Sequence, residues 1–297
     1  MEQSTLFVVS QSSSGGLTLT QESSSNVGSF PTASSVSCSF EYQKSSYSAF
    51  YNAAKTRVEI YENTAKTGHF FVQKNNTSVT DAIDFLDAFT LGGNVYFSAY
   101  STSGEYINFY ALQGDLSLTK VYGGYIGSGY TMIKPLEYRN SVFFLAYNHT
   151  KGSVSKYQIM ATSQHPIYIN ETWSDTWAKQ WMRFAFFQFG GENFFIKTNM
   201  LHKKVNIDHL MDDLIEGSHP VLNEAAPSYM QTAVDVKTFS DNDGNAFFAV
   251  AQPGGDISVN QVHPNCLGWT EQCSASLTAA SSMLPYQVEG KQYLLVN

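Results

Sequence analysis

The sequence predicts an all-β protein, a six-bladed β-propeller built from four-stranded blades. A hairpin pattern recurs at positions 6, 47, 96, 143, 194, 247 and 293. The mean spacing is about 48 residues, which is typical of propeller blades. Apolar residues make up 43% and aromatic residues 14% of the chain, enough to fill a packed core. Turn signals recur every 8–12 residues without a convincing helical period, as expected for short strands.

Each hairpin joins a run of aromatic or aliphatic residues to an alternating strand through a polar turn. The clearest copy has a first strand at 143–148, a turn at 149–152 and a second strand at 153–159. The same pattern occurs at 6–20, 47–62, 96–112, 194–210 and 247–262, and in truncated form at 293–297.

A further strand is expected on either side of each hairpin. Runs that end in a turn precede the hairpins at 82–94, 131–140, 182–193, 232–245 and 281–291. Looser segments follow at 69–75, 120–129 and 166–177. A repeat therefore has four strands, and such sheets bury both faces only when they stack radially. One helix-like stretch, 206–217, is expected to be an insertion.

The two ends of the chain are expected to complete one blade together. The chain opens on what reads as the second strand of a repeat, at 5–10, and finishes with a first and a second strand, at 284–288 and 293–297. Pairing the terminal strands removes the last open edge, so residues 1–297 are expected to form a single propeller domain. One second strand is then redundant. Seven blades, two of them incomplete, is the alternative count.

Composition excludes several classes of function. The net charge is −8 with a pI near 5.3, so nucleic acid is not an expected partner. No run of about 18 apolar residues is present, so no membrane span is expected. The first residues lack the pattern of a signal peptide, which favours a cytoplasmic protein or one released by a non-classical route. Three cysteines are too few for a disulfide scaffold, although Cys266 and Cys273 are close enough in sequence to bridge.

Polar turns and aromatic loops are the predicted binding residues. The turns between hairpin strands begin with an amide in most repeats, and amides suit vicinal sugar hydroxyls. Aromatic rings in the segments between hairpins could stack on a pyranose. The amides could instead cap turns, and the rings could be core between blades. The candidates are Asn52, Asn148, Asn199, Gln252, Tyr122, Tyr125, Tyr229, Trp173, Trp177, Trp181 and Trp269.

Catalytic and metal-binding patterns are weak. Nucleophile-elbow, zincin and phosphate-loop motifs are absent from the sequence. The run 241–244 resembles the opening of a calcium loop but occupies a position where sister repeats have a β-turn. The carboxylates Asp81, Asp84 and Asp87 could do acid–base work, yet no partner stands at a defined spacing. The sequence therefore predicts no enzyme, no catalytic residue, no metal and no cofactor.

The repeat length and the aromatic strands resemble β-propeller lectins, such as the six-bladed fucose-binding type of fungi and bacteria. Those lectins use a Trp, Arg and Glu set in most blades, whereas only three arginines occur here. The resemblance implies a carbohydrate-binding propeller with several glycan sites between blades, which gain avidity together. Two alternatives stay open. One is a propeller glycoside hydrolase or lyase with one central site, and the other is a protein-interaction module, for which a homo-oligomer is a candidate assembly.

Overall fold

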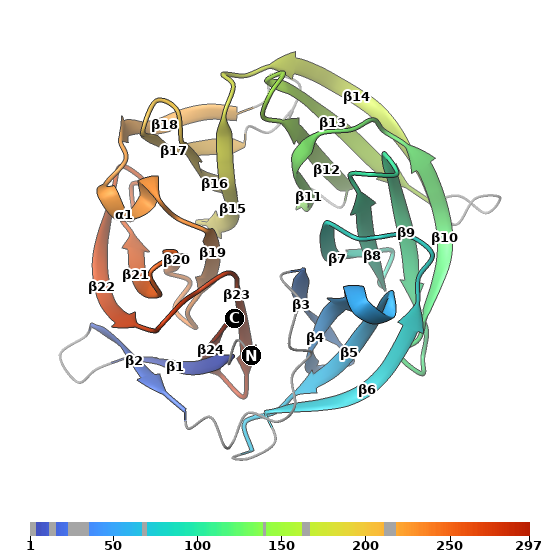
Figure 1. The fold of residues 1–297 in the computed structure, drawn as a ribbon, viewed down its shortest axis with the longest axis horizontal. Coiled ribbons are helices and arrows are strands. Elements are labelled where there is room, and N and C mark those ends of the chain that lie inside the picture. The colour runs from blue at the N-terminus through green and yellow to red at the C-terminus, as the bar shows by residue number, and fades with distance from the viewer. Residues whose placement is uncertain are drawn as a thin grey trace. The chain divides into compact units, whose positions relative to one another are not determined.

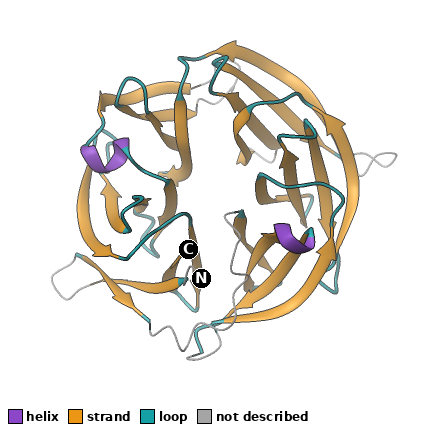
Figure 2. Cartoon of the chain, viewed as in Figure 1, coloured by secondary structure: helices purple, strands orange, loops and turns teal. Residues whose placement is uncertain are grey.

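The computed structural model describes residues 4–11, 16–22, 36–66, 70–138, 141–161, 167–210 and 218–297. These residues form six four-stranded antiparallel sheets, the blades of a β-propeller, which confirms the predicted fold class. The helices described are short: a 3₁₀ turn η2 (Ala53–Lys55) and α1 (Ser228–Gln231) (Figure 2). None of the described helices is long and apolar enough to cross a membrane.

The chain divides into two compact units, one formed by Met1–Phe30 with Gln180–Asn297 and the other by Pro31–Lys179. The second unit holds three blades of consecutive strands, drawn from blue to yellow-green in Figure 1. They are β3 (Ser37–Tyr42), β4 (Ser45–Asn52), β5 (Arg57–Asn63) and β6 (Phe71–Ser78); β7 (Phe85–Leu91), β8 (Asn94–Ser101), β9 (Tyr106–Leu112) and β10 (Leu118–Tyr125); and β11 (Tyr130–Tyr138), β12 (Ser141–Asn148), β13 (Ser153–Met160) and β14 (Tyr168–Thr176).

The first unit holds the other three blades, two of them consecutive and one shared by the chain ends. The consecutive blades are β15 (Trp181–Phe189), β16 (Glu192–Asn199), β17 (Lys204–Leu210) and β18 (Ser218–Ala225); and β19 (Asp235–Ser240), β20 (Ala246–Ala251), β21 (Asp256–Val262) and β22 (Trp269–Ser276). The shared blade combines β23 (Met283–Val288) and β24 (Lys291–Val296) with β1 (Thr5–Gln11) and β2 (Leu17–Gln21).

Neighbouring blades within each unit pack through apolar side chains that alternate along the strands. In the first unit, Phe248 and Val250 of β20 belong to the cluster shared with β16 and β17, while Phe247 and Ala249 belong to the cluster shared with β1 and β24. The second unit repeats this arrangement with two clusters of its own. The second and third strands of each blade are therefore apolar on both faces, as a sheet packed on both sides requires.

The terminal blade corrects one sequence assignment. Its strand order is β2-β1-β24-β23, and Leu6 pairs with Leu295 in the antiparallel register of β1 and β24 (Figure 1). The chain thus opens on the third strand of a blade, and the expected redundant second strand does not arise. A hairpin of the second and third strands and a hairpin of the third and fourth strands show the same alternation of apolar and polar residues. The sequence pattern therefore does not distinguish them.

Two local expectations also change. The stretch expected to be helical from 206 is strand β17 up to Leu210, because Val205 and Ile207 alternate into the core of the blade; residues 211–217 lie outside the described residues. Cys266 and Cys273 do not form a disulfide with one another. Cys266 packs in the cluster with β20, while Cys273 packs against the other cluster of that blade.

Candidate functional site

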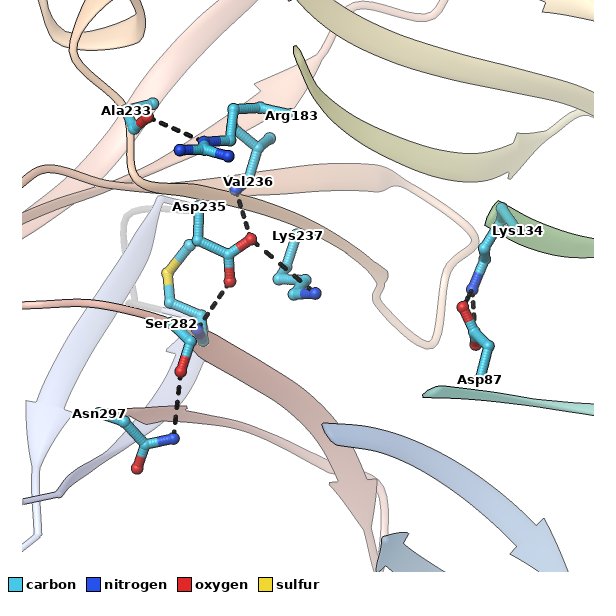
Figure 3. Close-up of polar contacts among 10 residues, drawn as sticks. Asp87, Lys134, Arg183, Ala233, Asp235, Val236, Lys237, Ser282 and Asn297 are labelled. Carbon is cyan, nitrogen blue, oxygen red and sulfur yellow. Dashed lines mark hydrogen bonds and ion pairs between the residues drawn. The ribbon is translucent and has the colours of Figure 1, made fainter. Parts of the chain in front are cut away.

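The first strands of the blades in the first unit bring together three ionic side chains. These strands, β15, β19 and β23, are edge strands of their sheets. The Thr238 hydroxyl donates to the Phe186 carbonyl, and Arg183 Nε donates to the Ala233 carbonyl over 3.0 Å. The first contact joins β15 to β19, and the second joins β15 to the segment just before β19. Because the later residue of one segment contacts the later residue of the other, the two strands run side by side in the same direction. Arg183, Asp235 and Lys237 lie along this pair of strands (Figure 3).

Arg183 is held in an unusual backbone conformation. It lies in a β-bulge of β15 between Met182 and Ala185, with φ of +52°, in the left-handed region. A bulge inserts an extra residue and redirects a side chain, and a residue other than glycine held there stores strain. In the described part of the chain, no other hydrogen bond or ion pair joins its guanidinium. The bulge therefore turns Arg183 toward β19 and leaves its terminal nitrogens available to an anion.

Asp235 is fixed by backbone donors at the start of β19. Its Oδ2 accepts a hydrogen bond from the Met283 amide of β23 over 2.8 Å, and its Oδ1 accepts one from the Val236 amide over 2.9 Å. Lys237 Nζ lies 3.8 Å from Oδ1. Figure 3 shows these contacts, with the Asn297 amide donating to the Ser282 hydroxyl beside them. The carboxylate is thus oriented by two blades at once.

The Asp235–Lys237 pair is looser and more accessible than the buried Lys197–Asp208 pair of the same unit. The side chains of Asp235 and Lys237 are 17% and 39% exposed. By contrast, Lys197 and Asp208 are 2.6 Å apart and nearly inaccessible, and burial lowers the pKa of the Lys197 ammonium. Lys237 therefore keeps hydrogen-bonding capacity for a ligand, whereas the buried pair serves the packing of the blade.

The second unit places an ion pair at the corresponding strands of its own blades. Lys134 Nζ of β11 contacts both carboxylate oxygens of Asp87 of β7, at 2.8 and 2.7 Å (Figure 3). Asp84 and Asp81 are also engaged, with the Thr102 amide and the Asn108 side chain. Of the three aspartates that the sequence offered for acid–base work, Asp87 is paired through both oxygens with one lysine, whereas Asp84 and Asp81 each accept a hydrogen bond.

A carboxylate bracketed by two cations suits the attack of water on an ester. Arg183 contacts the chain two residues before Asp235, and Lys237 stands two residues after it. Two residues of extended chain span at most about 7 Å, so each cation lies within reach of a small ligand held over the carboxylate. In the residues that the structure describes, no group of three His, Cys, Asp or Glu side chains could hold a metal ion.

The predicted amides mostly serve their own turns. Asn148 Oδ1 accepts hydrogen bonds from the Thr150 and Lys151 amides, and Asn199 Oδ1 accepts one from the His202 amide. Asn52 Oδ1 likewise accepts from the Lys55 amide. Gln252 is half-buried, and its backbone closes the turn to Asp256. The run 241–244 forms the expected β-turn, in which Asp241 Oδ1 accepts hydrogen bonds from the Asp243 and Asn245 amides.

Asn52 also belongs to a buried network around Glu59. Its side chain donates to Glu59 Oε1, the Tyr61 hydroxyl donates to Oε2, and Arg57 pairs with the same carboxylate. Burial by itself would raise the pKa of Glu59, but the hydrogen bonds from Arg57 and Tyr61 outweigh it and hold the pKa below the ordinary value of 4.5.

This network predicts a loss of stability in acid. A carboxyl whose pKa is lower in the folded than in the unfolded state stabilises the fold above its unfolded pKa, and that contribution disappears as the pH falls through the folded value. At pH values below about 4.5, the melting temperature should therefore decrease as the pH falls. Glu59→Gln should make the melting temperature less dependent on pH in this range. Thermal unfolding between pH 7 and pH 3 measures both. An identical slope for the variant and the wild type would show that Glu59 is not responsible.

The predicted aromatic residues are spread over several blades. In the second unit, Tyr122 packs 5.7 Å from Phe109, and the exposed Tyr125 lies edge-on to Tyr106. Trp173 stands on β14 opposite Lys156, and only Trp177 lies in a connection, 5.7 Å from the Tyr147 ring.

In the first unit, Trp181 is buried at the start of β15 under Lys197. Trp269 Nε1 donates to the Tyr229 hydroxyl, which donates to Asn260. Within either unit, these contacts do not gather the predicted rings and amides into one site. Ligand binding by any of them stays a prediction.

Sequence reasoning missed the site on β15 and β19. Arg183 is one of only three arginines in the chain, and no motif marks Asp235. The alternation of Asp235 and Lys237 places both on one face of a strand, which is a weak signal. Nothing in the sequence spacing indicates that Arg183, which lies about fifty residues earlier, reaches the same strand.

Comparisons with known proteins support the fold. No family model and no curated protein sequence matches the chain. Among solved structures, the chain is similar to a Bacteroides fragilis protein provisionally described as a 6-phosphogluconolactonase, with a TM-score of 0.58, 15% identity, and coverage of 99% of this chain and 88% of that one. The periplasmic gluconolactonase of Pseudomonas aeruginosa matches with a TM-score of 0.58, 13% identity and the same coverage. A luciferin-regenerating enzyme has a TM-score of 0.51 and 9% identity over 89% of this chain and 92% of that one.

These similarities overturn the lectin prediction. Two of these three similar structures are named as lactonases and the third as a luciferin-regenerating enzyme, so all three are named as enzymes and none as a lectin. The prediction of a non-enzymatic, glycan-binding protein was therefore wrong. Its main support was polar turns kept in every blade, and Asn and Ser recur there because they cap backbone amides.

Proposed function

We propose that this chain is a hydrolase that opens the lactone ring of a sugar acid at Arg183, Asp235 and Lys237. The observation that carries the proposal is the accessible carboxylate of Asp235, fixed by two backbone amides and bracketed by two cations. The names of the similar propellers, 6-phosphogluconolactonase and gluconolactonase, support this substrate class. The fold by itself does not assign a reaction, because one fold hosts many activities.

The three side chains have complementary tasks in this reaction. Asp235 accepts a proton from a water molecule as that water attacks the lactone carbonyl carbon. The carbonyl oxygen then carries negative charge, which Lys237 and Arg183 stabilise. The ring carbon–oxygen bond breaks, and the proton held by Asp235 passes to the leaving ring oxygen. The product is a hydroxy acid, which ionises to its carboxylate.

Proton release from glucono-δ-lactone in weakly buffered indicator solution tests the proposal. The wild type should exceed the spontaneous rate. Lys237→Met should lower the enzymatic rate about 10²–10³-fold, the usual effect of removing one donor to an oxyanion. The matched control is Lys74→Met on β6, because the Lys74 side chain is 38% exposed and also forms an ion pair.

Two results would overturn the proposed function. One is hydrolysis at the spontaneous rate for both glucono-δ-lactone and its 6-phosphate. The other is an equal loss of rate in Lys237→Met and Lys74→Met, which would show that the activity does not depend specifically on this site. Melting temperatures of the variants establish that each is folded.

A further inference from the structure

The ionic side chains of this site carry a positive balance in a chain whose net charge is −8. Arg183 and Lys237 contribute two positive charges, and Asp235 contributes one negative charge. Lys237 is only loosely paired at 3.8 Å, and the guanidinium of Arg183 holds a single backbone carbonyl among the described residues. The site thus has unused donors for an anion.

A neutral lactone does not use this charge, whereas its hydrolysis product does. The lactone carbonyl is uncharged, while the carboxylate of the opened acid carries a full negative charge. Guanidinium and ammonium groups bind carboxylates through short, charge-assisted hydrogen bonds, and arginine can do so with two parallel bonds. Groups that stabilise the oxyanion of the reaction therefore also favour the product over the substrate.

We infer that Arg183 and Lys237 form a carboxylate site for a polyhydroxy acid, so that the product acid binds more tightly than the lactone and inhibits the enzyme. This inference rests on the proposed function for the identity of the acid. Arg183 is the anchor, because it lies in the bulge of β15 and its Nε is held on the Ala233 carbonyl.

Asp235 is expected to lower the affinity of this site for the acid. Its carboxylate repels a bound carboxylate, and this repulsion limits the affinity for the acid. Asn has the same shape and can still accept the hydrogen bond from the Met283 amide. Asp235→Asn should therefore bind the acid more tightly than the wild type, although it loses the base needed for hydrolysis.

Calorimetric titration of the full chain with gluconate, and with the uncharged polyol sorbitol, tests the inference. Gluconate should bind and sorbitol should not. Arg183→Met and Lys237→Met should each weaken gluconate binding roughly tenfold or more, as expected for a hydrogen bond to a charged group. Asp235→Asn should strengthen it, and Lys74→Met should leave it unchanged.

The outcomes separate this inference from the proposed function. Equal binding of gluconate and sorbitol, or unchanged gluconate affinity in both cation variants, overturns the carboxylate site even when lactone hydrolysis is observed. Weaker binding to Asp235→Asn overturns it as well. Gluconate binding with the expected pattern but without lactone hydrolysis supports the carboxylate site and overturns the hydrolase proposal.

Discussion

Replacing Asp235 with asparagine is expected to slow lactone hydrolysis by about 10²–10⁴-fold, the usual contribution of a positioned general base. The variant keeps the shape of the side chain and an oxygen for the Met283 amide, so the junction of β19 and β23 should persist. Rates of acid release and melting temperatures, measured on the same preparations, test both expectations.

A second asparagine substitution, made away from the site, distinguishes the loss of the base from a general effect of removing a carboxylate. Asp243→Asn, an exposed residue of the turn before β20, is the control and should behave as the wild type. Full activity in Asp235→Asn would mean that another group accepts the proton.

Deleting Lys291–Asn297 is expected to prevent the first unit from folding. This deletion removes β24, which lies between β1 and β23 and pairs with both. Tyr293, Leu294, Leu295 and Val296 are all at most 2% exposed. Each such side chain contributes roughly 1.5–3 kcal/mol when buried, and together they approach the whole stability of a typical domain, about 5–15 kcal/mol.

Point substitutions calibrate this result. Leu295→Ala should cost about 2–5 kcal/mol, as for other fully buried leucines. Leu19→Ala should cost less, because Leu19 is only half-buried on the edge strand β2. Denaturant unfolding monitored by tryptophan fluorescence measures both. A truncated chain with an unchanged melting temperature would show that β1 completes the blade without β24.

The sequence determined the blades because their pattern is local. An alternation of period two with a turn every 8–12 residues is sufficient to predict short antiparallel hairpins, and the repeat of about 48 residues predicts their number. The caps at Asn52, Asn148 and Asn199 are local in the same sense, since each side chain binds an amide three residues later or nearer. Their recurrence was evidence of fold, and it suggested a binding function only because capping and sugar recognition use the same residue types.

The tertiary structure decided what depends on contacts between distant segments. The pairing of Leu6 with Leu295 places the N-terminal hairpin as the third and fourth strands of its blade, and no local pattern distinguishes this from the second and third. Arg183 meets the carbonyl of Ala233 because a bulge turns it across to the next blade. Asp235 is oriented by the Met283 amide of a third blade. Strand alternation fixes which face a side chain occupies, but the neighbour on that face is set by how the blades pack, so the sequence supplied these residues and only the fold assembled them.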